Sequence, residues 1–169
     1  MTLIVCPLNA VSAEIARWKP ARLLSLLGPD QAAPEAPADI IQQVLRFHDI
    51  PEPHAGMIAP NRAMVAEILA FGAAWREPEP LLIHCWMGIS RSTAAALVIA
   101  CAADPARDEA EIAQALRQAS PSATPNPLVV ALADEWLGRE GRMVAAAASI
   151  GRGAEAFNGA PFLLPVRRR

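Results

Sequence analysis

Short apolar runs alternate along the chain with stretches in which apolar residues recur at helical spacing. The runs predict four strands, at Leu3–Cys6, at Arg22–Leu27, around Val44, Leu45 and Phe47, and at Leu81–Ile83. The helical spacing predicts six helices, at Ala10–Trp18, Pro60–Trp75, Arg91–Ala103, Asp108–Gln118, Pro127–Leu137 and Gly141–Ile150. The run at Leu81–Ile83 is apolar throughout, which is typical of a central strand covered on both faces.

The order of these elements indicates the fold class. Strands that alternate with helices form a mostly parallel sheet. We therefore expect an α/β fold, with a central sheet of about four to five strands covered by helices on both faces. No repeat or change of composition divides the chain, so residues 1–169 are interpreted as one domain with an irregular tail from about residue 158. Ligands of such sheets bind beyond the carboxyl ends of the strands, where residues 84–92 begin.

Composition narrows the function classes. A net charge of −2 and a pI near 5.9 indicate neither a nucleic-acid nor a membrane partner. Cys6, Cys85 and Cys101 are widely spaced and odd in number, which favours a reduced compartment over a disulfide scaffold. The apolar stretches are too short for a signal peptide or a membrane span, so we expect a soluble cytoplasmic protein. The arginine and alanine bias resembles that of bacterial proteins from GC-rich genomes.

The stretch HCWMGISRS, residues 84–92, joins the last predicted strand to an apolar helix. A tight loop at this point turns backbone N–H groups inward, and the helix adds its unpaired N-terminal donors and positive dipole end. Gly88 permits close approach of a ligand, and the Arg91 guanidinium can bind two oxygens of an oxyanion. Such positive surroundings also stabilise a thiolate. We therefore predict that Cys85 is a nucleophile at the base of a phosphate-binding loop.

This stretch resembles the H-C-x5-R-[ST] signature of the cysteine-dependent protein tyrosine and dual-specificity phosphatases. His84, Cys85, Gly88, Arg91 and Ser92 occupy its fixed positions, and the likeness extends over about residues 44–137. The resemblance implies a phosphatase fold and metal-independent hydrolysis of phosphomonoesters through a phosphocysteine, with no cofactor. It also implies phosphorylated proteins or small aryl phosphates as substrates, and phosphate, sulfate or vanadate-like oxyanions as ligands.

The resemblance also assigns roles to residues. Cys85 attacks phosphorus, while Arg91 and the loop amides hold the equatorial oxygens more tightly in the transition state. Ser92 donates a hydrogen bond to the departing sulfur, and His84 orients the loop. The implied phosphate-binding residues are Trp86, Met87, Gly88, Ile89, Ser90 and Arg91.

A carboxylic acid from another loop should protonate the leaving oxygen. Asp49 lies 36 residues before Cys85 and has a proline four residues later, as in the W-P-D-x-G-x-P loop of the tyrosine-specific branch, although no Trp-Pro precedes it. We predict that Asp49 is the acid, with Glu52 and His54 as alternatives. Asn126 is expected to cap the following helix and to tie its loop to the phosphate site.

Several alternatives stay open. A phosphate-recognising binding module without turnover is the alternative function, because the acid loop departs from the family pattern. A sulfurtransferase is disfavoured, since those enzymes commonly have one residue fewer between cysteine and arginine. Ser90 is expected to act as an N-cap, Cys6 is a candidate partner for a protective disulfide with Cys85, and the arginines at 167–169 are expected to form a solvated tail.

Overall fold

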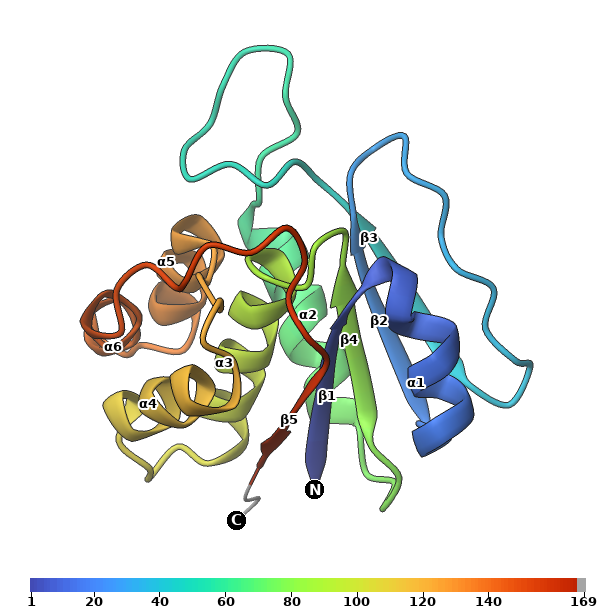
Figure 1. The fold of residues 1–169 in the computed structure, drawn as a ribbon. Coiled ribbons are helices and arrows are strands. Elements are labelled where there is room, and N and C mark those ends of the chain that lie inside the picture. Colours follow the sequence, from blue (N-terminus) through green and yellow to red (C-terminus); the bar gives the residue numbers. More distant parts are fainter. Residues whose placement is uncertain (167–169) are drawn as a thin grey trace.

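A five-stranded mixed sheet forms the centre of the molecule (Figure 1). The computed structural model describes residues 1–166, so the arginine tail at 167–169 lies outside the described residues. The strands are β1 (Thr2–Pro7), β2 (Arg22–Leu27), β3 (Ile41–Arg46), β4 (Leu81–Cys85) and β5 (Phe162–Pro165). They lie in the order β3-β2-β4-β1-β5, and every neighbouring pair is parallel except β1 and β5. The predicted α/β fold with a mostly parallel sheet is therefore confirmed.

Helices cover both faces of the sheet, as expected. They are η1 (Leu8–Ala10), α1 (Val11–Trp18), α2 (Arg62–Ala74), α3 (Arg91–Ala103), α4 (Glu109–Ala119), α5 (Pro127–Trp136) and α6 (Arg142–Ser149). In Figure 1, α1 lies on one face, where Ile4, Leu23 and Leu82 form a small apolar core with it. The larger core, which includes Ile83 and most of α3, lies on the opposite face beneath the remaining α-helices. None of the helices within residues 1–166 is both long and apolar enough to cross a bilayer.

Two expectations about the ends of elements were wrong. The tail is not irregular throughout, because Phe162–Pro165 forms the edge strand β5, antiparallel to β1. This strand has four residues and pairs with the opposite end of the chain, so no local pattern identifies it. Pro60 lies outside α2, whose N-cap is Asn61, with its side chain accepting a hydrogen bond from the backbone N–H of Met64.

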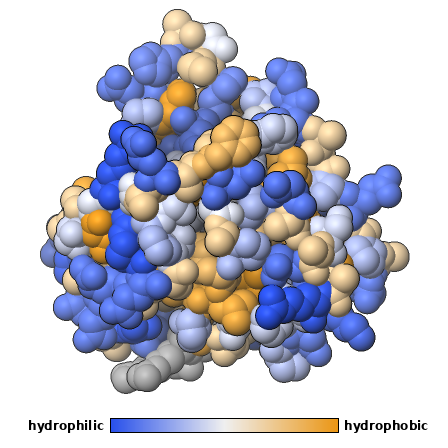
Figure 2. All heavy atoms as spheres, in the orientation of Figure 1, coloured by the Kyte–Doolittle hydropathy of each residue, from blue (hydrophilic) through white to orange (hydrophobic). Residues whose placement is uncertain are grey.

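The segment from α6 to β5, residues 150–161, runs across the front of the molecule as it is drawn in Figure 1. Hydrophilic residues cover most of the surface seen in Figure 2, whereas apolar residues gather in its lower centre, around β5. The carboxyl ends of the four parallel strands meet at one edge of the sheet. The candidate site lies at this edge, as expected for an α/β sheet.

Candidate active site

The predicted phosphate-binding loop joins the end of β4 at Cys85 to the start of α3 at Arg91. Gly88 in this loop has a positive φ of 70°, a conformation that favours glycine. A Cβ atom at Gly88 would lie 2.6 Å from the backbone nitrogen of Pro7 in β1. The loop is thus packed directly against the end of β1, and only glycine fits at its sharpest bend.

Cys85 lies at the base of the loop, with 2% of its surface exposed. Its Sγ atom accepts a hydrogen bond from the Gly88 N–H at 3.2 Å, and the Ser92 Oγ lies 3.2 Å from the same sulfur. The Gly88 N–H donates to the sulfur, the Ser92 hydroxyl is in position to donate to a thiolate, and the first turn of α3 adds the positive end of its dipole. The surroundings of Cys85 are therefore suited to a sulfur anion.

Arg91 is a buried cation that lines the same cavity as Cys85. Its Nη1 donates to the Phe47 carbonyl at 2.9 Å, and its guanidinium lies over the Phe47 ring at 5.9 Å. Its Nε atom is buried and has no hydrogen-bond partner among residues 1–166. This leaves a charged donor available to an anion bound beside Arg91.

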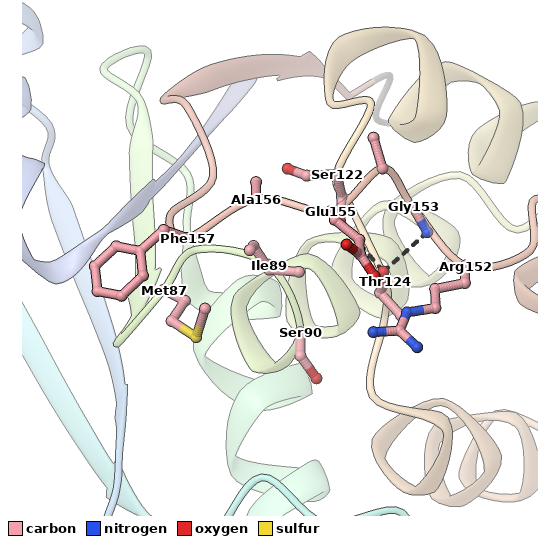
Figure 3. A pocket seen from close by; sticks show the side chains of 11 residues that line it. Met87, Ile89, Ser90, Ser122, Thr124, Arg152, Gly153, Glu155, Ala156 and Phe157 are labelled. Carbon is pink, nitrogen blue, oxygen red and sulfur yellow. Dashed lines mark hydrogen bonds between the residues drawn. The ribbon is translucent and has the colours of Figure 1, made fainter.

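The side chains of Cys85 and Arg91 line one cavity of about 240 Å³. Its other lining residues are Gln31, Asp49, Trp86, Met87, Ile89 and Ser90. A second cavity of about 850 Å³ shares Met87, Ile89 and Ser90 with it and extends toward Phe157 (Figure 3). Trp86 and Met87 thus form a partly exposed apolar wall around the smaller cavity.

Asp49 lies on the loop after β3 and faces the phosphate-binding loop. Its Oδ1 accepts hydrogen bonds from the Ser90 Oγ at 2.7 Å and from the Asn126 Nδ2 at 2.7 Å. Ser90 occupies the N-cap position of α3, as expected, but its side chain makes no capping hydrogen bond and donates to Asp49 instead. Asn126 caps α5 by accepting from the Val129 N–H at 3.0 Å. It therefore links α5 to the loop that carries Asp49.

The two alternative acids lie farther along the same loop. The Glu52 and His54 side chains lie 3.7 Å apart, are 74% and 54% exposed, and do not line the cavity that contains Cys85. Of the three candidate acids, Asp49 is the one that lines this cavity.

His84 lies beneath the loop and is fully buried. Its Nε2 lies 2.7 Å from the Ser25 Oγ of β2, which also accepts from the Gln42 Nε2 of β3 at 3.3 Å. Burial lowers the pKa of His84 to about 4; an interaction with the Cys85 backbone opposes this shift and the charge of Arg91 adds to it. A neutral His84 thus connects the end of β4 to the neighbouring strands.

The other two cysteines have surroundings that disfavour a thiolate. Burial raises the pKa of Cys6 far above its usual range and that of Cys101 to about 12. Cys6 is paired in register with His84 and packs with Ile4 in the core beneath α1, whereas Cys85 belongs to the core on the opposite face. Because the two side chains point to opposite faces of the sheet, the geometry does not favour a Cys6–Cys85 disulfide.

Sequence reasoning missed three contributors to the site. Gln31 reaches the cavity because the Arg46 Nη1 binds the Gln31 carbonyl at 2.6 Å and fixes the loop after β2. Ser25 supports His84; as a polar residue within an apolar run, it was a visible signal. Residues 151–161 pass beside the loop, and their glycines were the available signal of close backbone contact.

Comparison with solved structures identifies the fold. Similar chains include DUSP15, with 18% identity, a TM-score of 0.65, and coverage of 88% of this chain and 89% of that chain. Human DUSP28 has 21% identity and a TM-score of 0.62, and the match covers 82% of this chain and 92% of DUSP28. A mouse protein of the dual-specificity phosphatase type, solved with zinc tungstate, has 18% identity and a TM-score of 0.59. The match covers 88% of this chain and 86% of the mouse chain.

The comparisons of sequence alone give no such match. No protein-family model matches the chain, and no curated protein shows significant similarity to it. At identities this low, the structural likeness establishes the fold and not the activity. The fold is thus that of dual-specificity phosphatases.

Proposed function

We propose that the protein is a cysteine-dependent phosphomonoester hydrolase of the tyrosine or dual-specificity type. The observation that carries the proposal is the placement of Cys85, Arg91 and Asp49 around a single cavity. A nucleophile, a cationic oxyanion ligand and a candidate proton donor are the groups that transfer of a phosphoryl group to sulfur requires. Phosphate, sulfate or vanadate-like oxyanions are the expected ligands.

The reaction has two steps. The Cys85 thiolate attacks phosphorus and forms the P–S bond, while the bond to the leaving oxygen breaks and Asp49 protonates that oxygen. Arg91 and the amides of residues 86–91 bind the equatorial oxygens. Water then attacks phosphorus, Asp49 takes its proton, and the P–S bond breaks as Ser92 donates a hydrogen bond to the sulfur. The donors around Sγ and the unpartnered Arg91 Nε support this assignment.

The shape of the site supports a phosphorylated protein as substrate. The small cavity suits a phosphoryl group and part of its ester, whereas the adjoining cavity of about 850 Å³ has room for flanking side chains. The two cavities share Met87, Ile89 and Ser90, so a polypeptide bound at Cys85 would continue into the larger one. Small aryl phosphates need only the first cavity and are the simplest test substrates.

The test is hydrolysis of a small aryl phosphate by the wild-type protein and by Cys85→Ser. We expect the substitution to lower kcat at least about 10⁴-fold, because it removes the nucleophile, while phosphate still binds. Cys101→Ala is the matched control, since Cys101 is buried in α3 away from the cavity. If wild type binds phosphate without turnover, the protein is instead a phosphate-recognising module.

A further inference from the structure

Residues 151–161, here called the C-terminal strap, connect α6 to β5. The strap passes beside the phosphate-binding loop (Figure 1), and Figure 3 shows Gly153, Ala156 and Phe157 on the same cavity as Met87 and Ile89. The strap lies beyond residues 44–137, to which the sequence resemblance extends. Its contacts with the loop are therefore a feature of this chain that the resemblance does not explain.

The loop carbonyls are held outward by neighbouring segments. The Trp86 carbonyl accepts from the Leu8 N–H at 3.2 Å, and the Ile89 carbonyl accepts from the Thr124 N–H at 2.9 Å. A trans peptide directs its C=O and N–H in opposite directions, and residues 1–166 contain no cis peptide. Each carbonyl that is bound outside the loop therefore turns the N–H of the next residue inward.

The strap holds the third of these carbonyls. The Gly159 N–H donates to the Met87 carbonyl at 2.8 Å. The same peptide unit carries the Gly88 N–H, which donates to the Cys85 Sγ at 3.2 Å. A chain of two hydrogen bonds thus runs from the strap through one peptide unit to the sulfur, and each bond in such a chain polarises the other.

Gly159 is in close contact with the loop. It is buried, and a Cβ atom there would lie 2.8 Å from the Gly88 carbonyl oxygen and 3.3 Å from its carbon. The strap is fixed on both sides of this contact. The Gly153 N–H donates to the Thr124 Oγ1 at 3.0 Å, and β5 pairs with β1. A side chain at residue 159 would therefore push against loop backbone that has little room to move.

We propose that Gly159 is a positioning residue, which orients the Met87–Gly88 peptide so that its N–H faces the sulfur and a bound oxyanion. The C-terminal strap is then part of the oxyanion site, although none of its residues touches the reacting atoms. The inference rests on the proposed function for its biological meaning, but it concerns anion binding and can be tested without turnover.

The first test compares Gly159→Ala with Ala160→Ser, a control that adds one atom at the neighbouring exposed position. We expect Gly159→Ala to weaken phosphate binding about tenfold, which is the effect of impairing one charge-assisted hydrogen bond. We also expect Cys85 alkylation by anionic iodoacetate to slow more than alkylation by neutral iodoacetamide. Cys85→Ser gives the background from the other cysteines.

The ratio of the two alkylation rates separates positioning from general loosening, because a merely structural effect changes both rates by the same factor. An unchanged ratio together with phosphate affinity within about twofold of wild type would overturn the proposal. Wild type that binds phosphate without hydrolysing aryl phosphates would remove the proposed function and leave this inference intact.

A second measurement needs no substitution. Amide hydrogen exchange at Gly159 in the wild-type protein should slow when phosphate is added, because an anion at the Gly88 N–H strengthens the bond from Gly159 to the Met87 carbonyl. Exchange of the Ala154 N–H, which binds the Pro121 carbonyl, is the internal reference. Equal exchange at Gly159 with and without phosphate would contradict the proposal even if Gly159→Ala fails to fold.

Discussion

Helix α3 has a cysteine, a buried arginine and a carboxylate near each of its ends, and the two sets are connected differently. At the C-terminal end, the Arg139 Nη2 donates to the Cys101 carbonyl at 3.1 Å. The Arg139 Nη1 pairs with Glu109 at 3.2 Å, and Glu109 also binds Arg142 at 3.3 Å. The charges at this end are paired with one another, and the group ties α4 to the segments around α6.

At the N-terminal end, Cys85, Arg91 and Asp49 line a cavity, but within residues 1–166 neither Arg91 nor Asp49 belongs to an ion pair. Arg91 binds a carbonyl, and Asp49 binds a hydroxyl and an amide. A buried charge without a counterion is costly unless a ligand supplies one. The two arginines are similarly buried, at 6% and 8% exposed, whereas Asp49 is exposed and Glu109 is buried. The missing counterion of Arg91 is therefore what distinguishes the binding site from the structural cluster.

The strongest test of this comparison replaces each buried arginine by methionine. Arg91→Met should lower kcat/KM at least about 10³-fold and abolish thermal stabilisation by phosphate, because the main cationic ligand is lost. The stability of its phosphate-free form should change by no more than about 1 kcal/mol, since an unpaired buried charge is removed.

Arg139→Met should show the reverse behaviour. Its free energy of unfolding should fall by roughly 3 kcal/mol because Glu109 loses a buried partner, while phosphate still stabilises the folded protein. Chemical denaturation and thermal melting with and without phosphate measure both effects. Equal loss of stability in the two variants would contradict the difference between the ends of α3.

The next prediction concerns His84, the neutral group beneath the N-terminal end. The unfolded chain binds a proton at this residue near pH 6.5, whereas the folded protein binds it only near pH 4. Its contribution to stability is therefore complete above pH 6.5 and is lost as the pH falls toward 4. The loss should amount to about 3 kcal/mol.

Denaturant titrations at several pH values check this loss, with His84→Gln as the comparison. The substitution should flatten the pH dependence of the unfolding free energy between pH 4.5 and 6.5, because it removes the group that titrates there. Glu77 does not interfere in this range: its bond to Arg22 lowers its pKa from 4.5 to about 2, so its contribution is lost only below pH 4.5. An equally steep fall of stability in His84→Gln would show that another group is responsible.

The smallest of the three expected effects is that of Asp49→Asn. Asparagine keeps an oxygen that can accept from Ser90 and Asn126, so the loop should retain its position. We expect kcat to fall about 10²-fold with unchanged phosphate affinity, and less for aryl phosphates with acidic leaving groups, which need no proton donor. Steady-state rates over a series of aryl phosphates measure this. A larger loss in Glu52→Gln or His54→Gln would assign the acid to one of those residues.

Most of the fold could be predicted from local patterns, because β1, β2 and β4 are apolar runs and helices follow β1, β3 and β4. The exception is β3, which is largely polar and follows β2 without a helix between them. The register of β1 with β4, which brings Pro7 against Gly88, requires the three-dimensional structure. The same is true of β5, because antiparallel pairing between the two ends of the chain leaves no mark in either segment.

The candidate site was predictable where its chemistry is continuous in sequence, from His84 to Ser92. The placement of Asp49 could be inferred from a spacing, but the bonds that hold it could not, since Ser90 would serve equally well as a helix cap. The contact of Gly159 with Met87 joins residues far apart in sequence, and only the folded chain reveals it.

The most direct test is to locate the covalent phosphoryl group. Wild-type protein is quenched during turnover of an aryl phosphate, digested, and analysed by mass spectrometry. The account predicts a phosphoryl group on the peptide that contains Cys85, none on the peptides that contain Cys6 or Cys101, and none in Cys85→Ser. Sustained hydrolysis without a phosphoryl group on Cys85, or hydrolysis that survives in Cys85→Ser, would contradict it.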